Sequence, residues 1–473
     1  MLIGLAVAMS FVSTFSSVDR AAAAAPVTYY VDRVAGHNTA SGTSPALAWN
    51  TLARVNRAKF QPGDQILFKR GDVWREQLTV NDSGTSAAPI KFGSYGVGGL
   101  PTISGAKCVS ASCMNGANRW IQTGSAAPIY RSSVKWKAGV FIADGEPLRF
   151  VAWNSTNPAV IWARMTPGSY SFDYRNRIAY IRMADGSSPD AHVIEAGWKN
   201  NNNYTVGAHD IEFDGIALRA GSLACVLTYR AVGWTFDNMD VRFCGGRFKD
   251  EDPLHQFYLG NGFELSNGTN GVTIRNSIIS DVFDSGISPQ LYTNYGTVRN
   301  ITIESTEIFN TPLKGIEIVV WSDNSTMSGI TVKNSYIHDS GRGWSAAENP
   351  NGALGTGIYS TVGPGLQSTI SGVVIQDSII ANNVLDGIAV GFDAGVTVIQ
   401  RNLITGNDYG IAFYDSQVET STGAIIVDNE NTANRETGLC FYVPNSLTGL
   451  QSSGNSSSDY CPATLAQHVS LYQ

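Results

Sequence analysis

Short runs of alternating apolar and polar residues return through the second half of the chain, and five of them resemble one another closely. Each copy begins with an apolar–polar alternation, passes through a polar pair to a second apolar segment, and leads to a Gly-Ile dipeptide. The copies are Ile274–Ile279 with Gly286-Ile287, Ile303–Ile308 with Gly315-Ile316, Val332–Ile337 with Gly357-Ile358, Ile375–Ile380 with Gly387-Ile388, and Ile399–Ile404 with Gly410-Ile411. A period of twenty-odd residues built from short strands indicates a solenoid, in which equivalent positions stack.

The spacing of these copies predicts the fold. Ser277, Thr306, Ser335, Ser378 and Asn402 hold the same place in each copy, and 29, 29, 43 and 24 residues separate them. The shortest step estimates a bare coil, and the longer steps carry loops at one recurrent place. Short alternating strands between turns rich in Gly, Asn, Asp and Ser are typical of parallel coils. We therefore predict an all-β protein, a right-handed parallel β-helix whose coils rise by about 4.8 Å.

The first 200 residues follow a different pattern. Ala48–Asn56 reads as a short amphipathic helix with Asn50 as its N-cap, suited to cover the open end of the solenoid. Residues 118–198 lose the coil pattern, and runs such as Ile178–Arg182 predict antiparallel hairpins. The expected organisation is a signal peptide at 1–25, an N-terminal cap with the first coils at 26–117, an inserted antiparallel β-domain at 118–198, the main β-helix at 199–442, and a C-terminal cap or tail at 443–473.

Composition and cysteine content indicate the cellular compartment of the protein and the class of partner to expect. Its 473 residues carry a net charge of −7, and no basic stripe is present, so a nucleic-acid partner is not expected. The apolar run at 2–13 is too short to span a membrane and precedes a small-residue region, which indicates export and secretion. Six cysteines fit an oxidising compartment and allow 15 pairings. The pairs closest in sequence are Cys108 with Cys113, Cys225 with Cys244, and Cys440 with Cys461.

Several segments together resemble a group of secreted bacterial β-helix carbohydrate-active enzymes. They are the opening Tyr30–Asp32 with Gly42–Pro45, the cap leading into Gly63-Asp64, and the insert with Phe172–Tyr174 and Tyr180–Arg182. The resemblance covers most of the chain, and its motifs are architectural. It implies a polysaccharide substrate and cleavage by hydrolysis or by β-elimination. We expect a monomer without a membrane span and without a required cofactor.

The repeat also predicts which polar residues meet. Side chains alternate along a strand, so the residue after each Gly-Ile isoleucine points outward. Aligning the coils places Glu264, Ser288, Glu317, Tyr359, Ala389 and Ala412 in one outward column. A second column before the glycine holds Asn261, Ser285, Lys314, Thr356, Asp386 and Tyr409. Long insertions at 246–261 and 342–356 precede this strip and are expected to wall it as a groove.

Carboxyl groups in this strip are the first candidates for catalysis. Glycoside hydrolysis uses two of them, about 5 Å apart for retention and roughly 6.5–9.5 Å apart for inversion. Glu317 lies one coil from Asp284 and two coils from Glu264, so it is the first choice. Crowding by other carboxyls would raise its pKa and suit a general acid, whereas Lys314 would oppose that shift. The catalytic candidates are Glu317, Asp284, Glu264, Asp386 and Lys314, with a Lys314–Asp386 salt bridge as the structural alternative.

Other residues near the strip are candidates for binding sugar. His255 belongs to the first insertion, and Trp344, Trp321 and Tyr359 could stack on sugar rings. Asp281, Asn310, Asp339 and Asn382 recur at one turn, where stacked Asn and Asp usually bond along the backbone. Asp281 is the exception, because it lies beside the groove close to Asp284.

Two alternatives to hydrolysis remain open at this point. A polysaccharide lyase or uronate epimerase needs a base, here Lys314 with Arg342 or His338, and Ca²⁺ is possible with Glu317 as a ligand. Gly315–Asn324 faintly resembles the alginate and chondroitin lyase group, although Trp321 and Ser322 stand where that group carries a basic residue. The polygalacturonase motifs are absent. A noncatalytic glycan-binding adhesin is the third interpretation, and the clustered titratable residues speak against it.

Overall fold

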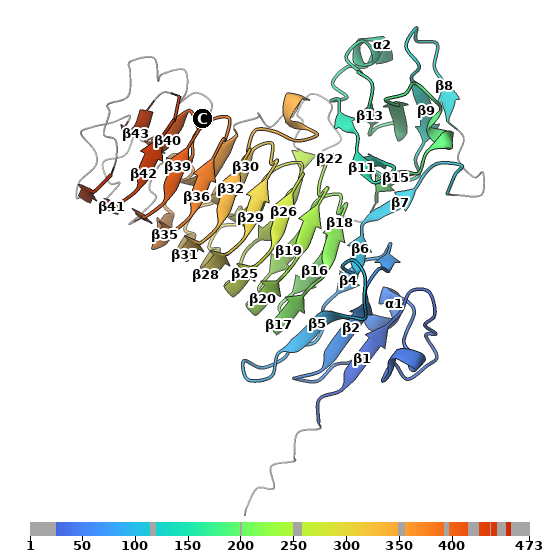
Figure 1. Ribbon diagram of the computed structural model, residues 1–473, viewed down its shortest axis with the longest axis horizontal. Helices are drawn as coiled ribbons and strands as arrows, with labels where there is room; N and C mark the ends of the chain where they lie inside the picture. The colour runs from blue at the N-terminus through green and yellow to red at the C-terminus, as the bar shows by residue number, and fades with distance from the viewer. Residues whose placement is uncertain are drawn as a thin grey trace, which may run out of the picture.

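The computed structural model describes residues 25–113, 120–198, 201–248, 258–348, 355–391, 397–414, 425–435, 437–441 and 451–455. Within them the chain winds as a parallel β-helix, and each full coil contributes one strand to each of three parallel sheets. Figure 1 shows the coils stacked in a row from the green strands at β17 to the red strands at β43. The solenoid predicted from the repeat is confirmed.

The strands of each sheet follow the winding order. The first sheet contains β1 (Thr28–Val31), β2 (Gln65–Lys69), β5 (Ile90–Tyr95), β17 (His209–Asp214), β20 (Val232–Asp237), β25 (Asn270–Arg275), β28 (Thr297–Glu304), β31 (Thr326–Lys333), β34 (Thr369–Ser371), β35 (Val373–Gln376), β38 (Thr397–Gln400), β41 (Ile425–Val427) and β44 (Gln451–Ser453). The second sheet contains β3 (Val73–Trp74), β6 (Thr102–Ser104), β18 (Ala217–Arg219), β21 (Asp240–Arg242), β26 (Ile278–Ser280), β29 (Glu307–Phe309), β32 (Tyr336–His338), β36 (Ile379–Ala381), β39 (Leu403–Thr405) and β42 (Glu430–Thr432). The third sheet contains β4 (Leu78–Thr79), β16 (Asn201–Val206), β19 (Ala224–Tyr229), β24 (Asn261–Leu265), β27 (Ile287–Leu291), β30 (Lys314–Val320), β33 (Thr356–Val362), β37 (Ile388–Val390), β40 (Tyr409–Phe413) and β43 (Thr437–Phe441).

The core follows from the alternation seen in the sequence. In the first sheet, Ile274 pairs with Ile303, and Ile303 with Val332, from one coil to the next. These side chains are fully buried, whereas the intervening residues face outward. One continuous apolar cluster therefore runs from Val31 to Ile426. A shift of register by one residue would bring polar side chains into this core, so the alternation fixes the stacking.

Single residues in left-handed conformation turn the chain between the sheets. They lie after first-sheet strands at Asn238, Asn276, Ser305, Asn334, Asp377, Arg401 and Asp428, with φ between +49° and +54°. After second-sheet strands they lie at Asp281, Asn310, Asp339 and Asn382, with φ between +51° and +55°. Asn and Asp adopt this conformation more readily than most residues with a side chain. The predicted structural role of the Asp281 ladder fits this geometry, and Asn310 Nδ2 donates to Asp281 Oδ1 at 3.2 Å.

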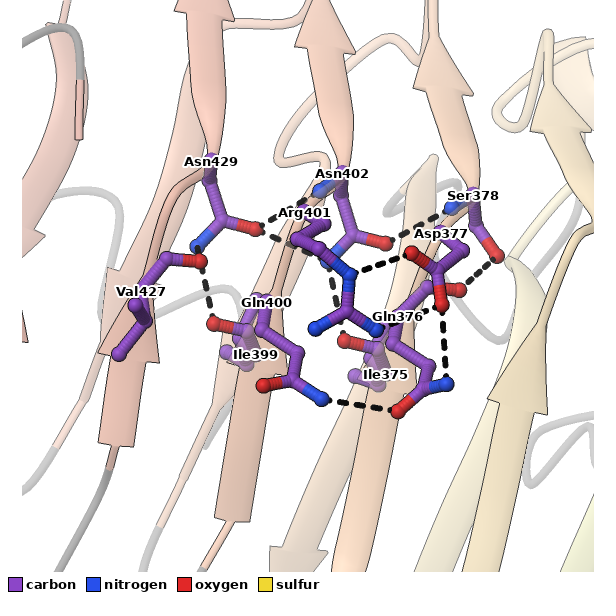
Figure 2. Close-up of polar contacts among 10 residues, drawn as sticks. All are labelled: Ile375, Gln376, Asp377, Ser378, Ile399, Gln400, Arg401, Asn402, Val427 and Asn429. Carbon is purple, nitrogen blue, oxygen red and sulfur yellow. Dashed lines mark hydrogen bonds and ion pairs between the residues drawn. The ribbon is translucent and has the colours of Figure 1, made fainter. Parts of the chain in front are cut away.

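Buried polar ladders follow these turns inside the coils. The side-chain oxygen of Asn402 accepts from Ser378 N at 3.0 Å, and the backbone N–H of Asn402 donates to Asn429 Oδ1 at 3.1 Å. Asn402 Nδ2 also donates to Ile375 O at 3.0 Å (Figure 2). On the outer surface of these turns, Arg401 binds the carboxylate of Asp377 with two nitrogens, at 2.7 and 2.8 Å. The repeated Ser and Asn positions of the sequence are therefore buried hydrogen-bonding positions that tie successive turns together.

The beginning of the solenoid differs from the prediction. Residues 45–56 form only a 3-10 turn, Pro45–Leu47, and one α-helical turn, α1 (Leu52–Val55), so the expected helical cap is not shown. The N-cap is Thr51, whose side chain accepts from Arg54 N, and not Asn50. Leu52 and Val55 nevertheless bury their side chains in the core. The apolar spacing had correctly indicated the buried side but not the length of the helix.

Antiparallel strands occur between Ala106 and Gly197, as the sequence predicted for this part of the chain. One sheet has the order β11 (Glu146–Pro147), β10 (Phe141–Ala143), β15 (Ile194–Gly197), β7 (Ala106–Cys108). The other has the order β12 (Arg149–Phe150), β13 (Ser169–Asp173), β14 (Ile178–Arg182), β9 (Tyr130–Ser133), β8 (Ile121–Gln122), and only its β12–β13 pair is parallel. The short helices α2 (Pro158–Trp162) and Pro189–Ala191 accompany them. The predicted domain boundaries stay predictions.

Two of the expected disulfides are present, Cys108–Cys113 and Cys225–Cys244. Cys461, of the third suggested pair, lies outside the described residues, as do the proposed signal peptide up to residue 24 and most of the expected C-terminal tail. In the part of the chain that the structure describes, no helix has the length and apolar character needed to cross a membrane. The disulfides are consistent with an extracytoplasmic location.

Candidate active site

The third sheet aligns the outward column predicted from the repeat. Glu264 pairs with Ser288, Glu317 with Tyr359, Tyr359 with Ala389, and Ala389 with Ala412. Ser288 and Glu317 come together through a hydrogen bond from Ser288 Oγ to Glu317 Oε2 of 3.3 Å. In the second column, Lys314 pairs with Thr356, and Ser285 N donates to Asn261 Oδ1 at 3.2 Å. The register expected for both columns is confirmed in these pairs.

The centre of the strip is an ion pair between Lys314 and Glu317. Lys314 Nζ lies 2.7 Å from Glu317 Oε1, and both side chains are buried. Glu317 Oε2 accepts weaker hydrogen bonds from Ser285 Oγ at 3.4 Å and from Ser288 Oγ at 3.3 Å. Every one of these contacts stabilises the ionised carboxylate. The salt bridge suggested from sequence between Lys314 and Asp386 is replaced by this one.

Asp284 has a different environment from Glu317. Burial, followed by the negative charge of Glu317, raises the pKa of Asp284 to about 7, while Lys314 opposes the shift. The side chain keeps partial access to solvent although protein surrounds its carboxyl group. Ser285 Oγ lies 3.3 Å from Asp284 Oδ1 and 3.4 Å from Glu317 Oε2. The two carboxyl oxygens are therefore no farther apart than the sum of these distances, about 6.7 Å.

Lys314 stays protonated in this environment. Burial alone would lower the pKa of Lys314, but the ion pair with Glu317 and the charge of Asp284 outweigh it and raise that pKa. Lys314 Nζ also lies 5.1 Å from the ring centroid of Tyr359. A lysine held as an ammonium ion is a poor acceptor for a substrate proton at neutral pH.

Two other predicted catalytic residues lie at the margins of this cluster. Glu264 is half-buried, one strand beyond Ser288, and its charge contributes to the raised pKa of Asp284. Asp386 is fully buried, and its Oδ2 accepts from Tyr414 Oη at 2.8 Å. The burial of Asp386 argues against direct contact with substrate. The structure thus brings Asp284, Lys314 and Glu317 together, with Glu264 beside them.

Two of the predicted stacking residues are buried. Trp344 is only 6% exposed, and its indole Nε1 donates to Asp281 O at 2.8 Å. Its ring packs against Phe283 and Tyr170, so it joins the antiparallel part to the β-helix and offers no face to a sugar. Tyr359 is 4% exposed, and burial raises the pKa of its hydroxyl. The sequence predicted that Trp344 lies in the second insertion and Tyr359 in the outward column, but not which side chains cover them.

Three further candidates belong to the second sheet and its turn. His338 is stacked between Tyr336 and Phe309, with ring centroids 3.9 and 5.1 Å away, and its nitrogens face Asp339 and Glu307. Arg342 Nη1 lies 3.1 Å from Asp339 Oδ1. Asp281 lies in the left-handed turn, where its side chain accepts from Ser280 and Asn310. Each of these groups therefore has a structural partner outside the Lys314–Glu317 cluster.

The loops around the strip are described only in part. His255 lies outside the described residues, and so do 249–257 and 349–354 of the two insertions, so the groove walls stay a prediction. The described part of the first insertion is the hairpin β22 (Arg247–Phe248) with β23 (Tyr258–Leu259), and the second contains the 3-10 turn Ala346–Glu348. Figure 1 shows β22 beside the antiparallel strands, at the edge of the coil stack.

Tyr292 is a residue that the sequence interpretation missed. Its side chain is 58% exposed, yet its hydroxyl is desolvated and close enough to feel Glu317, Asp284 and Glu264, and these effects raise its pKa well above the usual value. Tyr292 follows β27 by one residue, and Trp321 follows β30 by one residue and is 38% exposed. An aromatic residue at equivalent positions of two consecutive coils was the available signal.

Among the described residues, no group of three or more His, Cys, Asp or Glu side chains is arranged to hold a metal ion. The ammonium group of Lys314 already occupies Glu317 Oε1 at 2.7 Å. Calcium prefers six to eight oxygen ligands, and this donor set does not fit it.

Comparison with known proteins addresses the fold. Residues 261–431 match the family described as a right handed beta helix region. The chain contains a right-handed β-helix. This β-helix resembles the solved structure of XylC with xylose, at 12% identity and a TM-score of 0.56, over 88% of this chain and 67% of that one. It also resembles pectate lyase Pel9A, at 14% identity and a TM-score of 0.51, over 92% and 82% of the two chains.

Two more comparisons point in the same direction. A structure titled glycoside hydrolase matches at 9% identity and a TM-score of 0.50, over 94% of this chain and 98% of that one. A segment of 73 residues is 36% identical to lacto-N-biosidase of Bifidobacterium longum subsp. longum, and it spans 15% of this chain and 5% of that protein. The structural neighbours of the right-handed β-helix thus include hydrolases and lyases. The three solved structures are 12%, 14% and 9% identical to this chain, and identities this low establish the fold alone.

Proposed function

We propose that this right-handed β-helix is a carbohydrate-active enzyme, and specifically a glycoside hydrolase that acts on a polysaccharide. The observation that carries the proposal is the pair of unlike carboxyl groups, Asp284 and Glu317. Burial raises the pKa of Asp284 to about 7, whereas Lys314 neutralises Glu317 at 2.7 Å. A carboxyl of raised pKa beside an ion-paired carboxyl supplies the two carboxyl groups that glycoside hydrolysis requires.

The assignment of roles follows from protonation. Asp284 is the general acid, because its raised pKa keeps a proton available for the leaving glycosidic oxygen. Glu317 is the nucleophile or base, because its carboxyl group faces the ammonium group of Lys314 at 2.7 Å and the hydroxyl groups of Ser285 and Ser288. Crowding by other carboxyls had suggested Glu317 as the general acid. In this assignment Asp284 takes that role, and Glu317 becomes the nucleophile or base. The proton of Asp284 passes to the leaving oxygen, and water finally supplies the hydroxyl group on the anomeric carbon.

The distance between the carboxyl oxygens bears on stereochemistry. The upper bound of about 6.7 Å includes the spacing of retaining enzymes, about 5–5.5 Å between carboxyl groups, and reaches only the lower end of the inverting range, roughly 6.5–9.5 Å. Retention through attack by Glu317 is therefore the favoured course. Proton NMR of the first product formed, read before mutarotation, gives the anomer and tests this step.

Elimination is the alternative, since pectate lyase Pel9A shares the fold. It would need Lys314, or another group, to remove a proton next to a uronate carboxylate. The raised pKa of Lys314 and the surrounding carboxylates disfavour that role and that substrate. The described residues also offer no calcium site. The secreted location stays a proposal that the disulfides support.

The test compares two products and three variants. The protein is incubated with xylan, β-glucan, galactan, chitin oligomers, pectate and alginate, and both reducing ends and the ultraviolet band of unsaturated uronates are followed. We expect reducing ends without the ultraviolet band. Asp284→Asn and Glu317→Gln should each lower kcat by about 10²–10⁴-fold.

A matched control is available on the first sheet. Glu304 forms an ion pair with Lys333 at 2.7 Å there, and Glu304→Gln should keep full activity. Asp284→Asn leaves the Lys314–Glu317 pair intact, so its loss of activity cannot arise from breaking that pair. An ultraviolet band, or full activity of either site variant with a normal circular dichroism spectrum, would reject the hydrolase assignment.

A further inference from the structure

Two exposed aromatic side chains lie at equivalent positions of consecutive coils in the third sheet. Leu291 pairs with Val320, and the next residues are Tyr292 and Trp321. Trp321 N donates to Leu291 O at 2.8 Å, so the backbone keeps this register beyond the strands. Tyr292 is 58% exposed and Trp321 is 38% exposed. The two rings are therefore anchored about one strand spacing apart, about 4.8 Å, on the outer face of the coils.

A glycine in the following coil supports the indole of Trp321. Gly363 N donates to Val320 O at 2.8 Å, which places the Gly363 backbone beside Trp321. A Cβ atom at Gly363 would lie 2.7 Å from Cε3 of the indole, which is closer than real contacts allow. The indole thus rests against the backbone of Gly363 while part of its surface stays open to solvent. Its position is fixed by the protein, as a binding platform requires.

Tyr292 links this aromatic pair to the carboxyl groups. The ring is open to solvent, but the hydroxyl is desolvated and lies within electrostatic reach of Glu317, Asp284 and Glu264. Ser288, four residues before Tyr292 and on the same side of the chain by alternation, donates to Glu317 Oε2 at 3.3 Å, so this side of the strand faces the carboxyl groups. Desolvation, followed by those charges, raises the pKa of the Tyr292 hydroxyl well above its usual value. Tyr292 can therefore present its ring to a sugar while its hydroxyl stays beside the carboxyl groups.

The charge of the surroundings selects against an acidic sugar. Asp284, Glu264 and Glu317 contribute carboxyl groups, and the ammonium group of Lys314 is already paired with Glu317 at 2.7 Å. Arg342 lies outside this cluster and is paired with Asp339. A uronate entering this cluster would bring a further negative charge to a partly desolvated site that already holds three carboxyl groups against one ammonium group, and like charges in such a site repel strongly.

We propose that Tyr292 and Trp321 form a binding subsite for an uncharged pyranose ring of the substrate, next to Asp284 and Glu317. The apolar face of the sugar stacks on the two aromatic rings, and the neighbouring glycosidic bond then reaches the carboxyl groups. This inference rests on the proposed hydrolase function and names its substrate class: a neutral glycan, not a polyuronate.

Binding without turnover tests the subsite. The Asp284→Asn protein is titrated with neutral xylo-, cello-, manno-, galacto- and chito-hexaoses and with hexagalacturonate, by calorimetry and by tryptophan fluorescence. We expect at least one neutral oligosaccharide to bind and hexagalacturonate to bind more weakly. Adding Tyr292→Ala or Trp321→Ala should weaken that binding about tenfold, and Trp321→Ala should remove part of the fluorescence change.

The control is Tyr336→Ala, an exposed tyrosine on the second sheet, which should bind as the parent does. Tighter binding of hexagalacturonate, unchanged binding by both aromatic variants, or no binding of any neutral oligosaccharide would overturn the subsite. Failure of the hydrolase proposal has a different signature. In that case neutral oligosaccharides bind through Tyr292 and Trp321, but the parent protein releases no reducing ends from their polymers.

Discussion

At the scale of single residues, the site depends on two carboxyl groups that share one chemistry and differ in surroundings. Glu317 is held by the ammonium group of Lys314, whereas burial and the charge of Glu317 raise the pKa of Asp284 to about 7. The same negative charge that Lys314 stabilises on Glu317 thus disfavours ionisation of Asp284. Lys314 is therefore better understood as a residue that separates two protonation states than as a base.

This separation predicts the pH dependence of activity. A general acid must be protonated, so the rate should fall about tenfold per pH unit above about pH 7. A pH profile of kcat on a cleaved glycan measures this limb. A rate that instead rises through pH 7 would mean that Asp284 acts as a base.

Stability should respond to the same group. The folded pKa of Asp284 lies above its ordinary value of 3.8, so folded protein holds a proton that unfolded chain releases. The stabilising contribution is present below about pH 3.8 and is lost as pH rises towards about 7. Asp284→Asn removes this pH-dependent loss of stability, because the amide does not titrate. The substitution should therefore raise Tm more at pH 8 than at pH 4. Calorimetry at both pH values checks it, and an equal shift at both would contradict it.

At the scale of elements, turns and ladders hold successive coils in register. The turn after β38 contains Arg401, which forms an exposed ion pair with Asp377 of the preceding coil, and the buried ladder residue Asn402. Asn402→Ala should cost about 1–3 kcal/mol, because Ser378 N loses an acceptor and Ile375 O loses a donor, while Asn429 Oδ1 keeps only the backbone N–H of residue 402. Arg401→Ala, one residue away, should cost no more than about 1 kcal/mol. Chemical denaturation of the two variants gives both values, and equal costs would refute the distinction.

At the scale of the whole molecule, one side chain joins the antiparallel part to the β-helix. Trp344 packs on Phe283 of the solenoid and on Tyr170 of β13, and Phe150 N donates to Trp344 O at 2.8 Å. Phe283 immediately precedes Asp284, so this junction also fixes one edge of the site. The antiparallel strands therefore support the catalytic strip from the side.

Removing this junction should destabilise both parts. Trp344→Ala should cost about 3–5 kcal/mol and increase hydrogen exchange in β13 and β14. Trp321→Ala is the matched tryptophan control, because its indole is partly exposed, and it should change sugar binding without a comparable loss of stability. Exchange mass spectrometry with thermal unfolding distinguishes the two. Equal stability of both variants would show that Trp344 does not carry the junction.

The repeat allowed the fold and the outward columns to be predicted from particular residues. Ile287, Ile316 and Ile358 pair along the third sheet as expected, and Ser288, Glu317 and Tyr359 follow them. The length of the N-terminal helix was not predictable, because Leu52 and Val55 bury their side chains in a single turn. The burial of Trp344 could not be read either, because Tyr170 lies 174 residues away in sequence.

The sequence by itself determined the winding of the chain and the alignment of Glu264, Ser288 and Glu317, since a stacked repeat converts equal spacing into vertical neighbours. Only the tertiary structure decided how each aligned residue behaves. Lys314 pairs with Glu317 and not with Asp386, and Tyr292 reaches the carboxyls from a turn. Alternation along a strand sets which face a side chain takes, whereas charge state and exposure depend on the atoms that other coils and the antiparallel strands place around it.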